Sequence, residues 1–419
     1  MKKWLTGTAA IVAVATATGL VGCSTGGGGG GETELSFMMW GDGGDTDKAY
    51  EKVIDAFEKE NPDITINAEF FNTNDYHNIL KTRMSGGAGP DVYGVDFGNI
   101  PDFVRDGFAA DLTEGGDYLE KLTDEAMEET KRYSEDGGSY NVPISLSGNG
   151  IIYNQDLFEQ VGITEEPTTK SELIDASEKL LAAGITPFAM SAQDNWWPQF
   201  IVYYALAENG ADEELAEQML AGEADFSSNE AWKESLDFVK ELVPYYMPNP
   251  LGTTQTAAQS AFLAGEAAMF PATWILNDAR KADMNAGYMN FPTVDEVPDE
   301  MWGTYQVRWG VNPGNGNQEA AQKFINFFFE DEVYTEFLSE VRLFPVTTTV
   351  EADESLDPLF PDMQQSWEGK KFIALFSPAN TEMQESLLVV LQNIISGQQT
   401  TEEGLAELDQ ALANVQAQQ

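Results

Sequence analysis

The order of strand-like and helix-like segments between residues 34 and 97 most constrains the fold of this chain. Three short apolar runs, typical of buried strands, occupy residues 34–40, 64–71 and 90–97. Between the first two runs, apolar residues recur at the spacing of one helix face: Tyr50, Val53, Ile54 and Phe57. Asn61-Pro62 then ends the helix. Strands alternating with helices in this way predict a parallel sheet with helices on its faces, and thus an α/β fold.

Ligands of such sheets bind in the crevice at the carboxyl ends of the strands. Trp40 and Asp42 follow the first predicted strand, Asn72 follows the second and Asp96 follows the third. These residues are therefore the first candidates for a binding site.

The rest of the chain predicts a second domain, with later segments that return to the first. Residues 140–162 are extended and rich in Gly and Ser, and the chain after them is mainly helical. In the helix predicted near residue 230, Trp232 shares a face with Leu236 and Val239, which indicates a core position. A chain of 419 residues is long enough for two such domains.

The N-terminus has the three parts of a secretory signal: Lys2 and Lys3, an apolar run, and small residues before Cys23. "LVGC" resembles a bacterial lipobox, so we expect residues 1–22 to be removed and Cys23 to be lipidated. The glycine run after it predicts a flexible tether over residues 23–33. An ordinary signal peptide with a chance cysteine is the alternative.

Charge and motifs exclude several functions. The chain has 70 acidic and 22 basic residues and a formal net charge of −48, so it is a poor partner for nucleic acid or for anionic lipid headgroups. His77 is the only histidine and reads as a surface residue of a polar helix. HExxH and phosphate-loop motifs are absent, and the one GxSxG match, at residues 22–26, lies across the predicted cleavage point and not in the strand–turn–helix setting that the motif needs. We therefore expect a binding protein with no cofactor and no metal, rather than an enzyme.

Several stretches in fixed order resemble one family: "YEKVIDAFEKENPDITI", "GGAGPDVYGVD", "YNVPISLSGNGIIYNQDLFEQVGI", "FLAGEAAMFPATW" and "EAAQKFINFFFEDEVYTEFL". They are similar to the extracellular solute-binding proteins of carbohydrate ABC transporters, which include the maltodextrin-binding protein. The resemblance runs from about residue 34 to the C-terminus. It implies a two-lobed periplasmic-binding-protein type II-like fold, with two α/β lobes joined by a multi-segment hinge and a ligand cleft between them.

Carried onto this chain, the resemblance implies crossings near residues 143–148, 305–311 and 344–349. The first lobe would hold residues 34–143 plus 308–344, and the second 148–305 plus 349–419. The implied partners are an oligosaccharide and the permease subunits of an ABC importer. We expect a monomer held at the outer face of the cell membrane by its lipid.

A sugar-binding cleft needs flat aromatic rings for the C–H faces and polar groups for the hydroxyl rim. The expected ligand-binding residues are Trp40, Asp42, Asn72, Asp96, Ser147, Trp196, Trp197, Trp274, Arg308 and Trp309. In the family, aromatics of the helical lobe stack on sugar rings, which implies that role for Trp274 and for one of Trp196 and Trp197. Asp42 and Asp96 would accept hydroxyl hydrogen bonds. Alternatively, Asp42 caps a helix, and Arg308 pairs with a hinge carboxylate.

Two departures from the maltodextrin-binding branch bear on the ligand. Val95 stands where that branch has a stacking tryptophan, and the helix predicted within 381–396 lacks another. A di- to tetrasaccharide of another type, such as an α-galactoside, is thus favoured over linear maltodextrin. A non-sugar solute of the same fold, or a secreted carbohydrate-active enzyme, is the alternative.

Replacing the single cysteine tests the lipid anchor. Cys23→Ala removes the only side chain that could carry the lipid, so the protein should leave the membrane fraction and appear in the medium or in a soluble fraction. Sedimentation of membranes followed by immunodetection measures this. A variant that still sediments with the membranes would contradict the lipid anchor.

Overall fold

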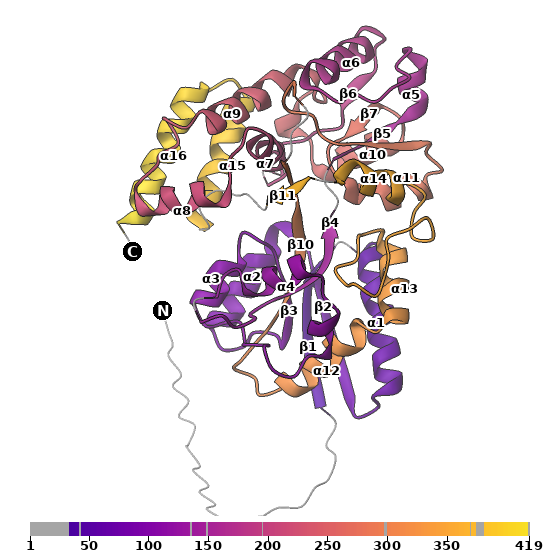
Figure 1. Cartoon of the computed structure of the whole chain (residues 1–419), viewed down its shortest axis with the longest axis vertical. Coiled ribbons are helices and arrows are strands. Elements are labelled where there is room, and N and C mark those ends of the chain that lie inside the picture. Colours follow the sequence, from indigo (N-terminus) through magenta and orange to yellow (C-terminus); the bar gives the residue numbers. More distant parts are fainter. Residues whose placement is uncertain are drawn as a thin grey trace, which may run out of the picture.

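The computed structural model describes residues 33–417 except 42, 135, 148–149, 195, 297–299, 369 and 374–380. Asp42, Cys23 and the predicted signal lie outside the described residues. Figure 1 shows two lobes, each built around its own sheet, with β4 and β10 running along the line that joins them. The observed architecture is therefore the two-lobed α/β arrangement that the sequence predicts.

The first lobe contains a five-stranded sheet of order β2-β1-β3-β10-β4. Its strands are β1 (Thr33–Trp40), β2 (Ile64–Phe71), β3 (Val92–Val95), β4 (Val142–Ser147) and β10 (Thr304–Val311). β1 pairs in parallel with β2 and β3, which confirms the parallel sheet predicted from the N-terminal segments. β10 returns from far along the chain and pairs antiparallel with both β3 and β4.

Helices cover both faces of this sheet. They are α1 (Asp45–Glu60), α2 (Thr73–Ser85), α3 (Ile100–Arg105), α4 (Asp124–Lys131), α12 (Gln318–Phe328) and α13 (Asp331–Val341), with a short 3₁₀ turn, η1 (Asp117–Lys121). The predicted apolar face of α1 is buried. The inner strand β3 is consequently buried along its whole length, whereas the edge strand β2 leaves Thr65 and Asn67 exposed.

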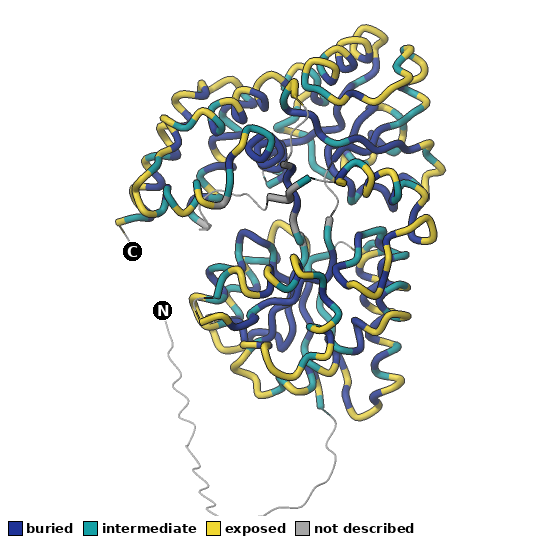
Figure 2. The backbone as a smooth tube through the Cα atoms, viewed as in Figure 1, coloured by how far each residue is buried: buried dark blue, intermediate teal, exposed yellow. Residues whose placement is uncertain are grey.

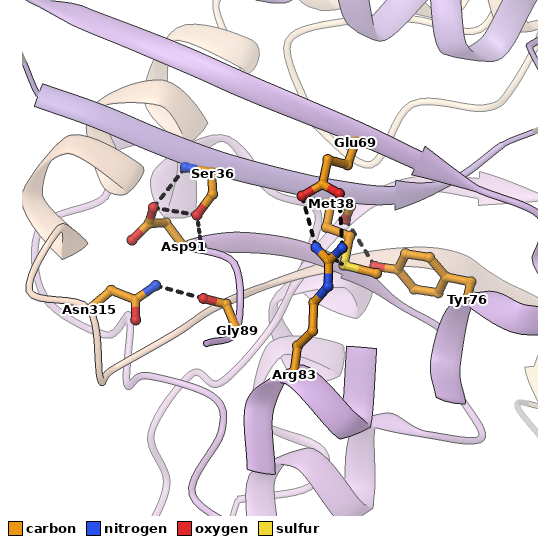
Figure 3. Close-up of polar contacts among 8 residues, drawn as sticks. All are labelled: Ser36, Met38, Glu69, Tyr76, Arg83, Gly89, Asp91 and Asn315. Carbon is orange, nitrogen blue, oxygen red and sulfur yellow. Dashed lines mark hydrogen bonds and ion pairs between the residues drawn. The ribbon is translucent and has the colours of Figure 1, made fainter. Parts of the chain in front are cut away.

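Three sets of polar contacts fix the position of β1, β3 and α2 relative to one another (Figure 3). The Asp91 carboxylate accepts hydrogen bonds from Ser36 N and Ser36 Oγ, both at 2.7 Å. Arg83 on α2 forms a two-pronged ion pair with Glu69 on β2, at 2.8 and 2.9 Å. The Tyr76 hydroxyl lies 2.9 Å from the carbonyl oxygen of Met38. These contacts hold the carboxyl end of β1 beside α2.

The second lobe contains a four-stranded sheet of order β6-β7-β5-β8. Its strands are β5 (Ile151–Asn154), β6 (Thr186–Phe188), β7 (Ala267–Phe270) and β8 (Ala286–Met289). β9 (Glu300–Trp302) and β11 (Lys371–Ile373) form a separate parallel pair. The helices are α5 (Gln155–Gln160), α6 (Lys170–Ala182), α7 (Gln199–Glu208), α8 (Glu213–Ala221), α9 (Glu230–Leu242), α10 (Gln255–Leu263), α11 (Leu276–Lys281), α14 (Phe360–Trp367), α15 (Thr381–Ile395) and α16 (Thr401–Gln416), with 3₁₀ turns η2 (Val243–Tyr245), η3 (Pro250–Gly252) and η4 (Thr273–Ile275).

Helix α7 is the centre of the second lobe. Its residues Gln199 through Ala207 are all buried, and the tube around α7 is dark blue in Figure 2. A helix that is apolar on all sides must be surrounded by other elements. Trp232 on the neighbouring α9 is 2% exposed, which confirms its predicted core position. Over the described part of the chain, no helix combines the length and apolar character needed to cross a membrane.

A buried carboxylate joins the two lobes beside the hinge. Asp357 is buried and accepts hydrogen bonds from Arg280 of α11, at 2.9 and 3.1 Å, and from Arg342, at 3.1 Å. Arg342 ends α13 of the first lobe in a left-handed conformation, with φ of 50°. One carboxylate thus ties a helix end of the first lobe to a helix of the second.

Glu208, at the C-terminal end of α7, is a carboxyl group whose burial disfavours its charged form. It lines a cavity of about 550 Å³ within the second lobe. Burial raises the pKa of its carboxyl to about 7, although hydrogen bonds donated by Thr293 N (2.7 Å) and Thr293 Oγ1 (2.6 Å) oppose the shift. Because the folded pKa lies above the unfolded one, burial of Glu208 begins to destabilise the fold as pH rises above the unfolded pKa, and the effect is complete above about pH 7.

Glu208→Gln removes this cost, since the amide oxygen can still accept from Thr293. The free energy of unfolding at pH 8 should rise by about 1–3 kcal/mol, while at pH 4, where Glu208 is neutral in both states, the two proteins should be alike. Urea unfolding at each pH measures the difference. Glu217→Gln on exposed α8 is the matched control, with no expected change at either pH. An equal effect of Glu208→Gln at both pH values would contradict the assignment.

Candidate functional site

A cleft of about 440 Å³ lies between the lobes. Its first-lobe wall comes from the carboxyl ends of β1 and β3, the first turns of α1 and α2, and the end of α13. Its second-lobe wall comes from η4 and from α7, α10 and α15. The lining residues are Trp40, Thr46, Thr73, Asn74, His77, Asn78, Asp96, Phe97, Asn99, Trp196, Gln199, Phe200, Gln255, Trp274, Val341, Leu343, Gln384, Glu385 and Leu388.

Each wall of the cleft carries tryptophan. On the first lobe, the Trp40 ring lies 5.5 Å from the His77 ring and 5.3 Å from that of Tyr76. On the second lobe, Trp196 packs edge-to-face on Phe200 at 5.6 Å, and Trp274 packs on buried Phe270 at 4.7 Å. Trp40, Trp196 and Trp274 are each only partly buried, so part of each indole is left for a ligand.

Polar groups on the first-lobe wall are oriented by their neighbours. One oxygen of Asp96 accepts hydrogen bonds from Asn99 N and Asn99 Nδ2, both at 2.9 Å. The other oxygen lies 3.6 Å from His77 Nε2. Asp96 and His77 are 28% and 19% exposed, so a donor and an acceptor stand together at the cleft surface beside Trp40.

Amide side chains line the opposite wall. Gln384 Nε2 lies 3.3 Å from Gln199 Oε1, and the Tyr203 hydroxyl donates to the same oxygen at 2.9 Å. A buried amide held in this way has a fixed orientation, which suits it to select a hydrogen-bonding partner.

The charge of the cleft is low and negative. Its lining includes the carboxylates Asp96 and Glu385 and the single imidazole His77, and none of its described lining residues is Lys or Arg. Among the residues that the structure describes, no group of three or more His, Cys, Asp and Glu is placed to hold a metal ion. The site can therefore stack on flat apolar faces and exchange hydrogen bonds with neutral groups, while its described lining offers an anion no lysine or arginine.

Four of the residues expected from the sequence meet in this cleft. Trp40 and Asp96 come from the first lobe, and Trp196 and Trp274 from the second. Of the two adjacent indoles, Trp196 and Trp197, only the first faces the cleft. Trp196 lines the cleft, whereas Trp197 is fully buried, with its ring 4.8 Å from Phe270 and 6.0 Å from Trp274.

Trp309 does not line the cleft, contrary to expectation. It is fully buried in the first-lobe core, stacked on Phe324 at 5.5 Å and edge-on to Phe37 at 5.6 Å. Its strand β10 lies in a sheet covered on both faces, so side chains that alternate along the strand are buried on both sides.

Arg308 is also fully buried and pairs with a carboxylate rather than lining the cleft, as the alternative reading had it. Its Nε donates to Glu129 Oε1 at 2.8 Å, and its Nη1 donates to the Tyr305 carbonyl oxygen. Glu129 on α4 is 0% exposed and also accepts from Arg132 Nε at 2.6 Å. The Arg308 guanidinium neutralises the buried Glu129 carboxylate. If Arg308 turned to a ligand instead, it would leave that carboxylate without this partner.

Asn72, another expected residue, is not among the described residues that line the cleft. Asn72 is the N-cap of α2, and its side chain accepts from Asn74 N at 3.1 Å, so its neighbours Thr73 and Asn74 line the cleft in its place. Ser147 is the last residue of β4 and is paired in register with Thr304. Asp42 lies outside the described residues.

His77 is a cleft residue that the sequence analysis placed on the surface. α2 buries Tyr76, Leu80 and Met84 along one face, but nothing in its sequence indicates that His77, next to this face, borders a cleft. The position of Tyr76, fully buried with its hydroxyl on β1 and β3, turns the next residue toward the Trp40 ring. Gln199 and Gln384 were likewise missed, because uncharged amides carry little signal in a sequence.

Comparisons with known proteins fit this architecture. Residues 40–335 match the family model for bacterial extracellular solute-binding proteins. A multiple sugar-binding protein of Streptococcus mutans is 24% identical over 350 residues, covering 80% of this chain and 80% of that protein. The structure of a chitin oligosaccharide binding protein matches with a TM-score of 0.82 at 22% identity, covering 92% of this chain and 100% of the other.

A sugar transporter protein from Bacillus licheniformis, solved in complex with stachyose, gives a TM-score of 0.77 at 19% identity, over 91% of this chain and 100% of the other. These structural matches establish the two-lobed fold. Since the family model spans more than half of the sequence, the chain belongs to the family of bacterial extracellular solute-binding proteins.

Proposed function

We propose that this protein is the sugar receptor of an ABC importer and captures an uncharged di- to oligosaccharide between its lobes. The observation that carries the proposal is the pairing of Trp40 on one wall with Trp196 and Trp274 on the other. A pyranose ring has two apolar C–H faces, and flat aromatic rings on opposed walls can cover both of them when the lobes close.

The polar lining supports a neutral ligand. Sugar hydroxyls both donate and accept, which matches a rim of amides with one oriented carboxylate and one imidazole. A uronate, sulfate or phosphate group would approach Asp96 and Glu385, and no lysine or arginine of the described lining would neutralise it. The names of two similar proteins, a multiple sugar-binding protein and a transporter protein in complex with stachyose, point to the same ligand class.

The protein would act at the outer face of the membrane, together with a permease. Family membership places the protein outside the cytoplasm. A lipid on Cys23 followed by the glycine tether would hold it at the outer face of the membrane as a monomer, within reach of the permease. The permease must prefer the closed form, because a ligand shifts the lobes only by binding that form better than the open one. In this proposal the protein binds the sugar and releases it chemically unchanged.

A ligand screen tests the proposed function. Residues 32–419 are mixed with neutral mono- and oligosaccharides, acidic sugars, amino acids and ions, and the melting temperature is measured. Binding to the folded state raises it by mass action. A rise with neutral oligosaccharides, without consumption of the sugar, is expected. A rise with acidic sugars or ions alone, or slow hydrolysis of the sugar, would contradict the proposal.

Trp274→Ala tests the stacking wall. Loss of one aromatic platform should weaken binding of the sugar found in the screen by about 1–3 kcal/mol, measured by calorimetry. Trp274→Phe keeps a flat ring and should retain most of the affinity. Trp196→Ala is the parallel test of the adjoining platform. An unchanged affinity of Trp274→Ala, with the melting temperature of the free protein also unchanged, would remove Trp274 from the site.

A further inference from the structure

Acidic residues greatly outnumber basic ones in both lobes, as they do in the whole chain. Closing the cleft brings two bodies of like charge together, and their mutual repulsion opposes closure. A cation placed where the lobes meet would therefore have more influence than the same cation elsewhere on the surface.

One such cation is present at the rim of the cleft. Lys281, the last residue of α11 in the second lobe, forms an ion pair with Asp45, the first residue of α1 in the first lobe. In Figure 1, α11 and α1 lie on the same side of the molecule. Thr46, which follows Asp45, lines the cleft, whereas neither Asp45 nor Lys281 does.

Each partner of this pair also suits the end of its own helix. An anion is favourable at a helix N-terminus and a cation at a C-terminus, so both side chains lie where their charge is stabilised before they meet. The ion pair with Lys281, with Lys48 second, lowers the pKa of Asp45. Lys48 Nζ lies 3.3 Å from the other oxygen of Asp45 but belongs to the same helix.

A second contact crosses between the lobes on the α2 side of the cleft. Asn74 Nδ2 on α2 donates to Asp194 Oδ1 at 3.0 Å, and Asp194 Oδ2 accepts from Gln255 N of α10 at 2.5 Å. Asp194 is two residues before Trp196, so this contact lies close in the chain to a cleft indole. The Asp45–Lys281 pair is the exposed charged contact between the lobes, in addition to the buried Asp357, which pairs with Arg342 of the first lobe and Arg280 of the second.

We propose that Lys281 and Asp45 act as an electrostatic latch, which raises the closed population of this acidic protein without touching the ligand. Both are positioning residues. Any increase in the closed fraction carries over to the apparent affinity for whatever closes the cleft. The ion pair is present in the protein without ligand, so the latch can be tested independently of the proposed sugar.

A charge swap tests the latch without ligand. The full chain with Cys23→Ser carries spin labels at Asp106→Cys, after α3, and Glu217→Cys, on α8, both exposed positions. Electron paramagnetic resonance then measures the distance between the lobes. Lys281→Glu or Asp45→Lys alone should lower the ratio of closed to open molecules by about two- to fivefold at low salt, the scale of an exposed ion pair.

The double variant Asp45→Lys with Lys281→Glu restores opposite charges and should restore the short-distance population. Lys48→Gln is the matched control, since it removes a partner of Asp45 within one lobe and should leave the distances unchanged. The effects of the single variants should shrink in 0.5 M salt, roughly where screening acts over a few ångströms. Equal distances in all variants, or a double variant that behaves like the singles, would overturn the latch.

Discussion

The structure depends on the antiparallel pairing of β10 with β3 and β4. These strands come from regions of the chain more than 150 residues apart, and their pairing inserts a returning segment into the middle of the first sheet. Trp309 and Arg308 anchor the segment on its two faces, one in the aromatic core and one on Glu129. Because β10 begins near the second lobe and ends inside the first, it fixes where the lobes can bend.

The cleft follows from this arrangement. The carboxyl ends of β1 and β3 deliver Trp40 and Asp96 to the edge of the first sheet, and α2 is held beside them by the buried Tyr76 hydroxyl. The second lobe faces them with the N-terminal end of α7, whose apolar body is buried and therefore rigidly placed. Flat rings thus oppose one another across a rim of neutral amides, while the charged residues of the chain lie mostly outside.

Local patterns in the sequence were enough to predict the parallel sheet, the buried face of α1 and the core position of Trp232, since each depends on spacing within one segment. Trp197, Trp309 and Arg308 could not be separated from true cleft residues in this way. Their burial depends on what covers the second face of a sheet or loop, which comes from distant parts of the chain. His77 was misjudged for the opposite reason, because a polar helix gives no indication that one of its faces borders a cleft.

The late return of β10 also governs how the protein can acquire its structure. Until residues 304–311 are available, β3 and β4 lack the strand that joins them, and the first sheet has open edges. Folding of the first lobe must therefore wait for most of the second lobe to be synthesised, which gives a high contact order and slow folding. Members of this family act outside the cytoplasm, and a first lobe that closes late is compatible with crossing a membrane before folding.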